Sequence, residues 1–148
     1  MEPEPTAAIF SLAEKLDHFK SPLESGLKVA KMGEKTFRWE DGAAASESSF
    51  NYSLDENAKT LQDWFERISE SERALLVLRR AVRFDKLGVH QALLRIEIAW
   101  TQKRLVGAAQ FLPQLDRVAK NESFLNIARE RAARLAETFR SSAKAAGE

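Results

Sequence analysis

The sequence predicts an all-α, single-domain bundle of five to six helices. Two observations support this fold class: apolar residues recur at helical spacing along most of the 148 residues, and helix-capping residues precede several of these stretches. The loops between the stretches are short, which is typical of helical bundles. With 44% hydrophobic and 30% charged residues, the composition is that of a globular protein rather than a disordered one.

The first predicted helix lies near the N-terminus. Pro5 and Thr6 can begin it, and it ends before Pro22, because proline disfavours helical backbone at the residue before it. Its apolar face is formed by residues at helical spacing, namely Ile9, Leu12, Ala13, Leu16 and Phe19.

Residues 21–40 allow two interpretations. Residues 21–24 (Ser-Pro-Leu-Glu) have the pattern of a capping box, which favours a second short helix that ends at Gly33. The alternative is a small β-hairpin within residues 27–40 that turns at Gly33. We prefer the helix, because an isolated two-stranded ribbon is only marginally stable in water.

The next segment, residues 41–53, is rich in serine and alanine, and we expect it to be a serine-rich loop or linker. It separates two parts of the chain. Residues 1–40 are expected to be an N-terminal helical segment that packs on the bundle, and residues 54–148 are expected to be the main helical bundle.

Helical signals are strongest in the main bundle. Residues 53–56 and 69–72 each have the Ser-x-x-Glu pattern of a capping box, so each is expected to begin a helix. Residues 89–112 form the longest predicted helix, and a proline follows it. A short helix over residues 115–119 and a C-terminal helix that begins near residue 124 complete the bundle.

The predicted helix over residues 89–112 has two apolar faces. The first face consists of Val89, Leu93, Ile96, Trp100 and Phe111. The second face consists of Leu94, Ile98, Leu105, Ala109 and Leu112. A helix of this kind usually lies in the middle of a bundle, and the alternative is that one face binds a partner or a second copy of the chain.

A narrow polar strip lies between these two faces and consists of His90, Glu97, Thr101 and Arg104. If both faces are buried, the strip is partly desolvated and its charges need partners. His90 and Glu97 are two helical turns apart, about 10.5 Å along the axis, so they cannot form a catalytic dyad on one straight helix. We expect a solvated or structurally paired strip, and a ligand or partner site is the alternative.

The helix that follows residues 69–72 carries a basic face. Arg79, Arg83 and Lys86 have the spacing i, i+4, i+7, and Arg80 borders them. Arginine binds phosphates and carboxylates well, so this face is a candidate surface for nucleic acid or for an acidic partner. The alternative is a solvated face opposite a buried stripe of Leu75, Leu78 and Val82. A further candidate site is a small apolar pocket lined by Trp64, Phe65, Trp100 and Phe111.

The residues that most enzyme chemistry needs are scarce or scattered in this sequence. There is no cysteine, and the two histidines, His18 and His90, are too few for a histidine metal site. The six glycines form no phosphate-binding loop. We therefore expect no enzyme activity, no cofactor and no metal.

These observations favour a non-catalytic helical protein-interaction or adaptor domain that binds a protein partner or forms a homo-oligomer. The alternatives are binding of nucleic acid or an acidic partner through residues 79–86, and binding of a small ligand inside the bundle. No stretch approaches ~18 uninterrupted apolar residues, so no membrane-spanning helix is expected. Binding to a membrane surface through residues 75–86 is not favoured either, because the core needs the apolar side of this segment. The lack of cysteine and of a signal-like N-terminus favours a soluble, cytoplasmic protein.

Overall fold

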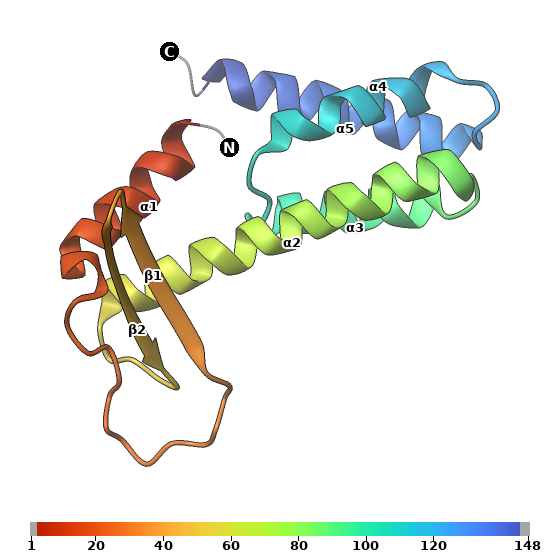
Figure 1. Ribbon diagram of the computed structural model, residues 1–148. Helices are drawn as coiled ribbons and strands as arrows, with labels where there is room; N and C mark the ends of the chain where they lie inside the picture. The colour runs from red at the N-terminus through yellow and green to blue at the C-terminus, as the bar shows by residue number, and fades with distance from the viewer. Residues whose placement is uncertain (1–2, 146–148) are drawn as a thin grey trace. The chain divides into compact units, whose positions relative to one another are not determined.

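The computed structural model describes residues 3–145. The protein is mostly helical, with 63% of its residues in helices, and the described part also contains one two-stranded antiparallel sheet (Figure 1). The elements in chain order are α1 (Pro3–Lys15), the short 3-10 helix η1 (Asp17–Phe19), β1 (Lys35–Asp41), β2 (Ala44–Phe50), α2 (Glu56–Phe84), α3 (Val89–Thr101), the 3-10 helix η2 (Ala108–Phe111), α4 (Leu112–Lys120) and α5 (Asn126–Ala145).

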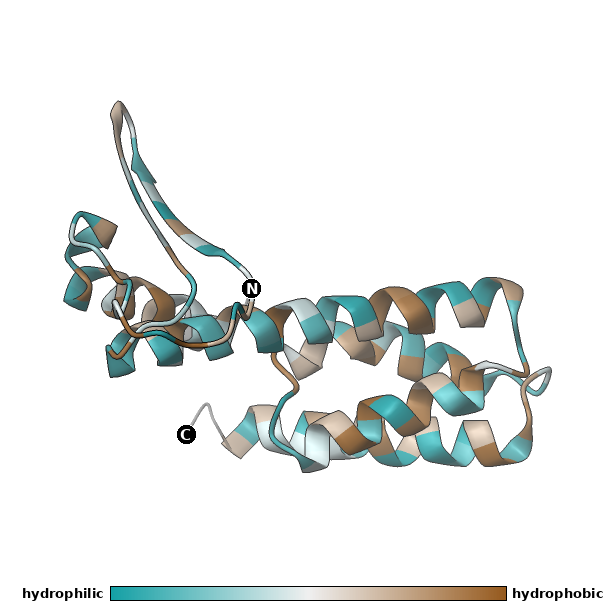
Figure 2. Cartoon of the chain, turned by 90° about the horizontal axis from the view of Figure 1, so that it is seen from below, coloured by the Kyte–Doolittle hydropathy of each residue, from teal (hydrophilic) through white to brown (hydrophobic). Residues whose placement is uncertain are grey.

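The chain divides into two compact units, residues 1–66 and residues 67–148. The boundary falls inside α2, so the N-terminal part of this helix belongs to the first unit and the rest belongs to the second. Figure 2 shows polar and apolar residues alternating along the helices, which is the pattern of amphipathic helices that bury one side. None of the helices described over residues 3–145 is both long and apolar enough to cross a membrane.

The first unit contains α1, the β-hairpin and the start of α2. Its core consists of Leu12, Ala13, Leu16, Phe19, Leu23, Phe37, Phe50, Ala58 and Leu61. The ring centroid of Phe37 lies 5.3 Å from that of Phe19 and 5.1 Å from that of Phe50, so the hairpin contributes directly to this core. The prediction for this helix is confirmed in part. The predicted apolar face supplies four of these nine buried residues, but α1 ends at Lys15, before the expected end at residue 21. Positive φ angles at residues 17–19 end the helix, so Leu16 and Phe19 are buried from outside it.

The observed β-hairpin differs from two of the sequence predictions. Its strands pair Lys35 with Phe50 and Asp41 with Ala44, and Gly42 lies in the turn with a φ of +58° that glycine adopts without a steric penalty. The prediction of a hairpin within residues 27–40 was therefore wrong in its register. The prediction of a serine-rich loop over residues 41–53 was also wrong, because most of this segment is strand β2. The ribbon is stable because it is not isolated, since Phe37 and Phe50 are buried in the core of the unit.

The expected second helix, over residues 22–33, is absent from the described structure, where this segment has no regular secondary structure. Asn51 holds it in place: its side-chain amide donates to the Ala30 carbonyl at 3.1 Å, and its side-chain oxygen accepts the Met32 N–H at 2.7 Å. Glu24 does not cap a helix either. Its carboxylate accepts the Asn51 backbone N–H at 2.6 Å, and this hydrogen bond lowers the pKa of Glu24.

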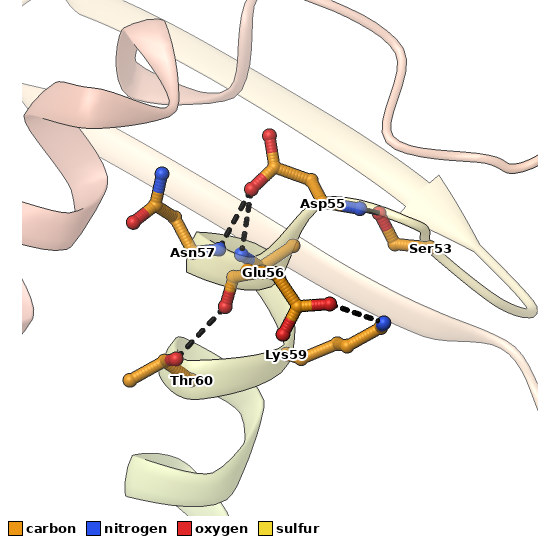
Figure 3. A network of polar contacts seen from close by, with 7 residues as sticks. Ser53, Asp55, Glu56, Asn57, Lys59 and Thr60 are labelled. Carbon is orange, nitrogen blue, oxygen red and sulfur yellow. Dashed lines mark hydrogen bonds and ion pairs between the residues drawn. The ribbon is translucent and has the colours of Figure 1, made fainter.

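Asp55 caps the start of α2, as Figure 3 shows. One carboxylate oxygen of Asp55 accepts the backbone N–H groups of Asn57, at 2.7 Å, and of Ala58, at 3.3 Å. The predicted cap, Ser53, instead accepts the N–H of Asp55 at 3.2 Å. The helix start predicted here is therefore confirmed to within two residues, with a different capping side chain.

The capping box predicted over residues 69–72 does not begin a helix, because α2 continues through it. Ser71 is buried, and its hydroxyl donates to the Arg67 carbonyl one turn earlier at 2.8 Å. The same oxygen accepts the backbone N–H of Val106 at 2.8 Å. A serine that forms such bonds is compatible with a helix interior.

The second unit is a helical bundle formed by the rest of α2 together with α3, α4 and α5. Its core is a continuous cluster of buried apolar residues that includes Leu75, Leu93, Leu115 and Phe139. The ring of Phe139 lies 4.9 Å from that of Trp100 and 6.2 Å from that of Phe111.

The long helix predicted over residues 89–112 is shorter than expected. It ends at Thr101, and Lys103 then adopts a φ of +56° that stops helical propagation. Pro113 does not end this helix but lies in the first turn of α4, a position that proline favours. The short helix predicted over residues 115–119 is confirmed as α4.

Candidate interaction surface

The four residues of the predicted basic face, Arg79, Arg80, Arg83 and Lys86, are all exposed. Arg83 lies over the ring of Phe84 at 5.0 Å, and Lys86 lies over the ring of Phe124 at 5.9 Å. Within residues 3–145, none of these four cations forms an ion pair with an acidic side chain. Their charges are therefore open to an external partner.

Large apolar side chains lie among these cations. The buried stripe of this part of α2 consists of Ser71, Leu75, Leu78, Ala81 and Val82, and Ala74 beside it is half-buried. The other residues of this stretch face solvent. Leu76 is 60% exposed, Val77 is 41% exposed and Phe84 is 73% exposed. We call the exposed side of this helix the α2 surface and define it by Arg73, Leu76, Val77, Arg79, Arg80, Arg83 and Phe84. It combines basic and apolar side chains along about three helical turns.

A shallow hollow of about 180 Å³ lies where α2 meets α3. We call it the α2–α3 groove. Its lining is mostly apolar and consists of Glu70, Arg73, Ala74, Val77, Ala92 and Arg95. Ala92 is buried and Ala74 is half-buried, so the groove exists because both helices place small residues where they meet.

The one acidic side chain of the groove is already paired. Arg104 donates from Nε and Nη2 to the two carboxylate oxygens of Glu70, at 2.7 and 3.1 Å. These hydrogen bonds lower the pKa of Glu70, and the charges of Arg104, Arg67 and Arg73 lower it further. Because Arg104 neutralises Glu70, the positive charges of Arg73 and Arg95 at the groove are not balanced by a free carboxylate of its lining.

Comparison with protein-family models, with curated proteins and with solved structures finds no match to this chain.

The predicted polar strip is divided between two ion pairs. Arg131 of α5 lies between His90 and Glu97: its Nε is 2.8 Å from a Glu97 oxygen, and its Nη1 is 3.0 and 3.2 Å from the two ring nitrogens of His90. The side chains of Arg131 and Glu97 are 16% and 35% exposed, so this pair links α3 to α5 in a partly buried setting. Arg104 lies beyond the end of α3 and pairs with Glu70.

Thr101 takes no part in either ion pair. Its hydroxyl donates to the backbone carbonyl of Glu97 at 2.9 Å. Glu97 and His90 thus link α3 to α5, and Thr101 bonds to the backbone of the last turn of α3. Sequence reasoning missed Arg131, whose positive charge neutralises that of Glu97.

The second apolar face of the predicted central helix is only partly covered. Ile98 is 47% exposed and Leu94 is half-buried, and these are the two members of that face that lie on α3 itself. Ile98 follows Arg95 by three positions, so it extends the exposed side of α3 beside the groove.

The four residues of the predicted apolar pocket lie in different units. Trp64 and Phe65 belong to the first unit, where the ring of Phe65 is 5.9 Å from that of Phe37. Trp100 and Phe111 belong to the second unit and pack on Phe139. A ligand pocket formed by these residues stays a prediction.

No cluster of three or more His, Asp or Glu side chains that could hold a metal ion occurs in the part of the chain that the structure describes. The candidate site consists of the α2 surface and the α2–α3 groove. Sequence reasoning identified Arg79, Arg80 and Arg83 of this surface, but it missed the exposed apolar residues and the contributions of Arg73 and Arg95. The spacing of Arg73, Val77 and Phe84 around the helix was the available signal.

Proposed function

We propose that the protein is a non-catalytic interaction module that binds an acidic protein partner through the α2 surface. The observation that supports this proposal most strongly is the combination of unpaired arginines with exposed Leu76, Val77 and Phe84 on one side of one helix. Exposed apolar groups surrounded by charged residues are typical of protein–protein interaction sites. A cytoplasmic location remains part of the proposal, supported by the lack of cysteine.

Nucleic acid is the second candidate partner, because the same arginines can contact phosphates. The apolar side chains favour protein instead. Leu76 and Phe84, which are 60% and 73% exposed, have no role in contacts with a phosphate backbone, whereas a protein partner would bury them.

The test is affinity capture with the full chain as bait, followed by reconstitution of each captured complex from purified proteins. The variant Leu76→Glu/Phe84→Glu removes the apolar part of the α2 surface. The matched control, Leu125→Glu/Ile127→Glu, changes two residues of the same unit that are 48% and 54% exposed. We expect a partner with an acidic surface that binds the wild type and the control, and binds the variant at least about tenfold more weakly.

Two results would contradict the proposal. One is that every reconstituted partner binds the α2-surface variant and the wild type equally well. The other is that the wild type binds a DNA duplex in a salt-dependent manner and that the purified chain binds no acidic protein, which would establish nucleic acid as the ligand.

A further inference from the structure

The α2–α3 groove defines the partner more closely. We infer that the partner presents an amphipathic acidic α-helix, which inserts one large apolar side chain into the groove and places carboxylates beside Arg73 and Arg95. This inference rests on the proposed function, because it concerns the same surface.

The size of the groove sets the kind of group that it can hold. Its volume of about 180 Å³ is below the roughly 300–1,000 Å³ of most small-molecule sites. An apolar cavity of about 150 Å³ can accommodate a group of the size of benzene. The groove therefore fits a single leucine or phenylalanine side chain, the usual size of an anchor residue at a protein interface.

The lining of the groove sets the polarity of that group. Ala74, Val77 and Ala92 give it an apolar floor, on which an apolar side chain loses no hydrogen bond. Arg73 comes from α2 and Arg95 from α3, so a cation stands on each of the two helices that form the groove. Neither arginine forms an ion pair within residues 3–145.

Charge complementarity then identifies the occupant. The carboxylate of Glu70 is bound by Arg104, so it does not repel an acidic ligand as a free carboxylate would. An α-helix presents residues i, i+3, i+4 and i+7 on one side, so an apolar anchor with Glu or Asp three or four positions away matches an apolar groove between two arginines. Val77 of the groove floor is 41% exposed, and Ile98, one turn after Arg95 on α3, is 47% exposed. The rest of the apolar side of that helix would cover both side chains.

The inference can be tested with a designed peptide as the probe. The peptide is a 20-residue helix with leucine at positions i, i+4, i+7 and i+11 and glutamate at the flanking positions. Three matched peptides replace all leucines by alanine, all glutamates by lysine, or scramble the order. Binding to the full-length chain is measured by fluorescence anisotropy at two salt concentrations. We expect the leucine–glutamate peptide to bind and each matched peptide to bind at least about tenfold more weakly.

Two protein variants locate the binding site. Ala74→Phe fills the groove from within, and Ala133→Phe is its control because Ala133 is exposed on α5. Arg73→Glu/Arg95→Glu reverses the charge of the groove, and Arg117→Glu/Arg134→Glu reverses two exposed arginines of α4 and α5. We expect Ala74→Phe and the groove reversal to weaken binding at least about tenfold, and the reversal to gain affinity for the lysine peptide. Both controls should bind as the wild type does, and circular dichroism checks that each variant is folded.

The outcomes separate this inference from the proposed function. If Arg79→Glu/Arg83→Glu abolishes binding of the acidic peptide while Ala74→Phe leaves it unchanged, the α2 surface binds acidic helices and the groove is not their anchor site. If the acidic peptide fails to bind at about 1 mM, or binds no better than the lysine peptide, the inference of an acidic helix is wrong even where a captured protein partner binds the α2 surface. The inference would also be wrong if the chain bound a DNA duplex more tightly than the peptide and if the variant Arg73→Glu/Arg95→Glu lost this DNA binding.

Discussion

The two units of this chain carry opposite charges. Residues 1–66 contain 7 Lys/Arg and 13 Asp/Glu, a net charge of −6, whereas residues 67–148 contain 16 and 9, a net charge of +7. The difference extends to how each unit is held together. The first unit has nine buried apolar residues in its core and relies on side chains such as Asn51 and Ser48 to hold irregular backbone. The second unit has twice as many, eighteen, in one helical core.

The comparison separates residues that stabilise the fold from residues that do not. In the second unit, Arg104, Arg131 and Arg140 each form an ion pair with an acidic residue of another element. The arginines of the α2 surface form no ion pair among the described residues. Arginines without an ion-pair partner in their own unit are the ones whose charge is available for binding.

The largest expected effect concerns the core of the second unit. Phe139→Ala should lower the free energy of unfolding by about 3–5 kcal/mol, because Phe139 is 1% exposed and packs on Trp100 and Phe111. Urea unfolding followed by circular dichroism measures this change. Phe84→Ala is the control, since Phe84 is 73% exposed and its loss should change stability by no more than about 0.5 kcal/mol. Equal effects of the two substitutions would contradict the assignment of core and surface.

A smaller effect is expected in the first unit. Asn51→Ala removes the hydrogen bonds that hold Ala30 and Met32, so the amide of Met32 should exchange with solvent faster, while the amides paired between β1 and β2 remain protected. The loss of global stability should be about 1 kcal/mol or less, because these bonds are exposed. Hydrogen exchange followed by NMR measures both quantities. A Met32 amide whose exchange is unaffected would mean that Asn51 does not hold this segment.

The smallest effect concerns pH. The lowered pKa of Glu70 means that its charged form is favoured in the folded state. Its contribution to stability is therefore present above the ordinary value of 4.5 and is lost as the pH falls through the lowered folded-state pKa. At neutral pH, Glu70→Gln should cost roughly 0.5 kcal/mol or less, because the side chain is 55% exposed and solvent screens the pair.

The difference between wild type and Glu70→Gln should then disappear in acid. Thermal unfolding at a series of pH values measures it, and Glu72→Gln, at an exposed position of the same helix, is the matched control. If the stability difference between wild type and Glu70→Gln grew as the pH fell, the pKa of Glu70 would not be lowered by Arg104 as described.

Local periodicity predicted the parts of the fold that depend on one helix alone. The apolar face of α1, the position of α4 and the buried stripe of Leu75, Leu78 and Val82 were all visible in the sequence. Strand β2 was not, because its residues, Ala-Ala-Ser-Glu-Ser-Ser-Phe, are mostly small and polar, and only Ser48 and Phe50 are buried. That segment becomes a strand through its pairing with β1, which local patterns do not reveal.

The candidate site shows the same limit. The exposure of Arg79 and Arg83 followed from their position opposite the buried stripe. Lys86 is exposed too, but the prediction that it lies on the same helix face was wrong, because α2 ends at Phe84. The α2–α3 groove did not follow, because Arg95 joins Arg73 only through the packing of two helices. The pairing of Arg131 with Glu97 across 34 positions likewise depends on tertiary structure.

Ser71 shows what a polar residue inside an apolar stripe can specify. An alanine at this position would favour the helix slightly more and would fit the buried stripe. The hydroxyl instead gives the N–H of Val106 one defined place to bind, 35 positions along the chain. An apolar stripe tolerates small shifts of the segment packed on it, whereas a single buried hydrogen bond does not. The serine thus specifies which backbone group of the segment after α3 lies against this point of α2.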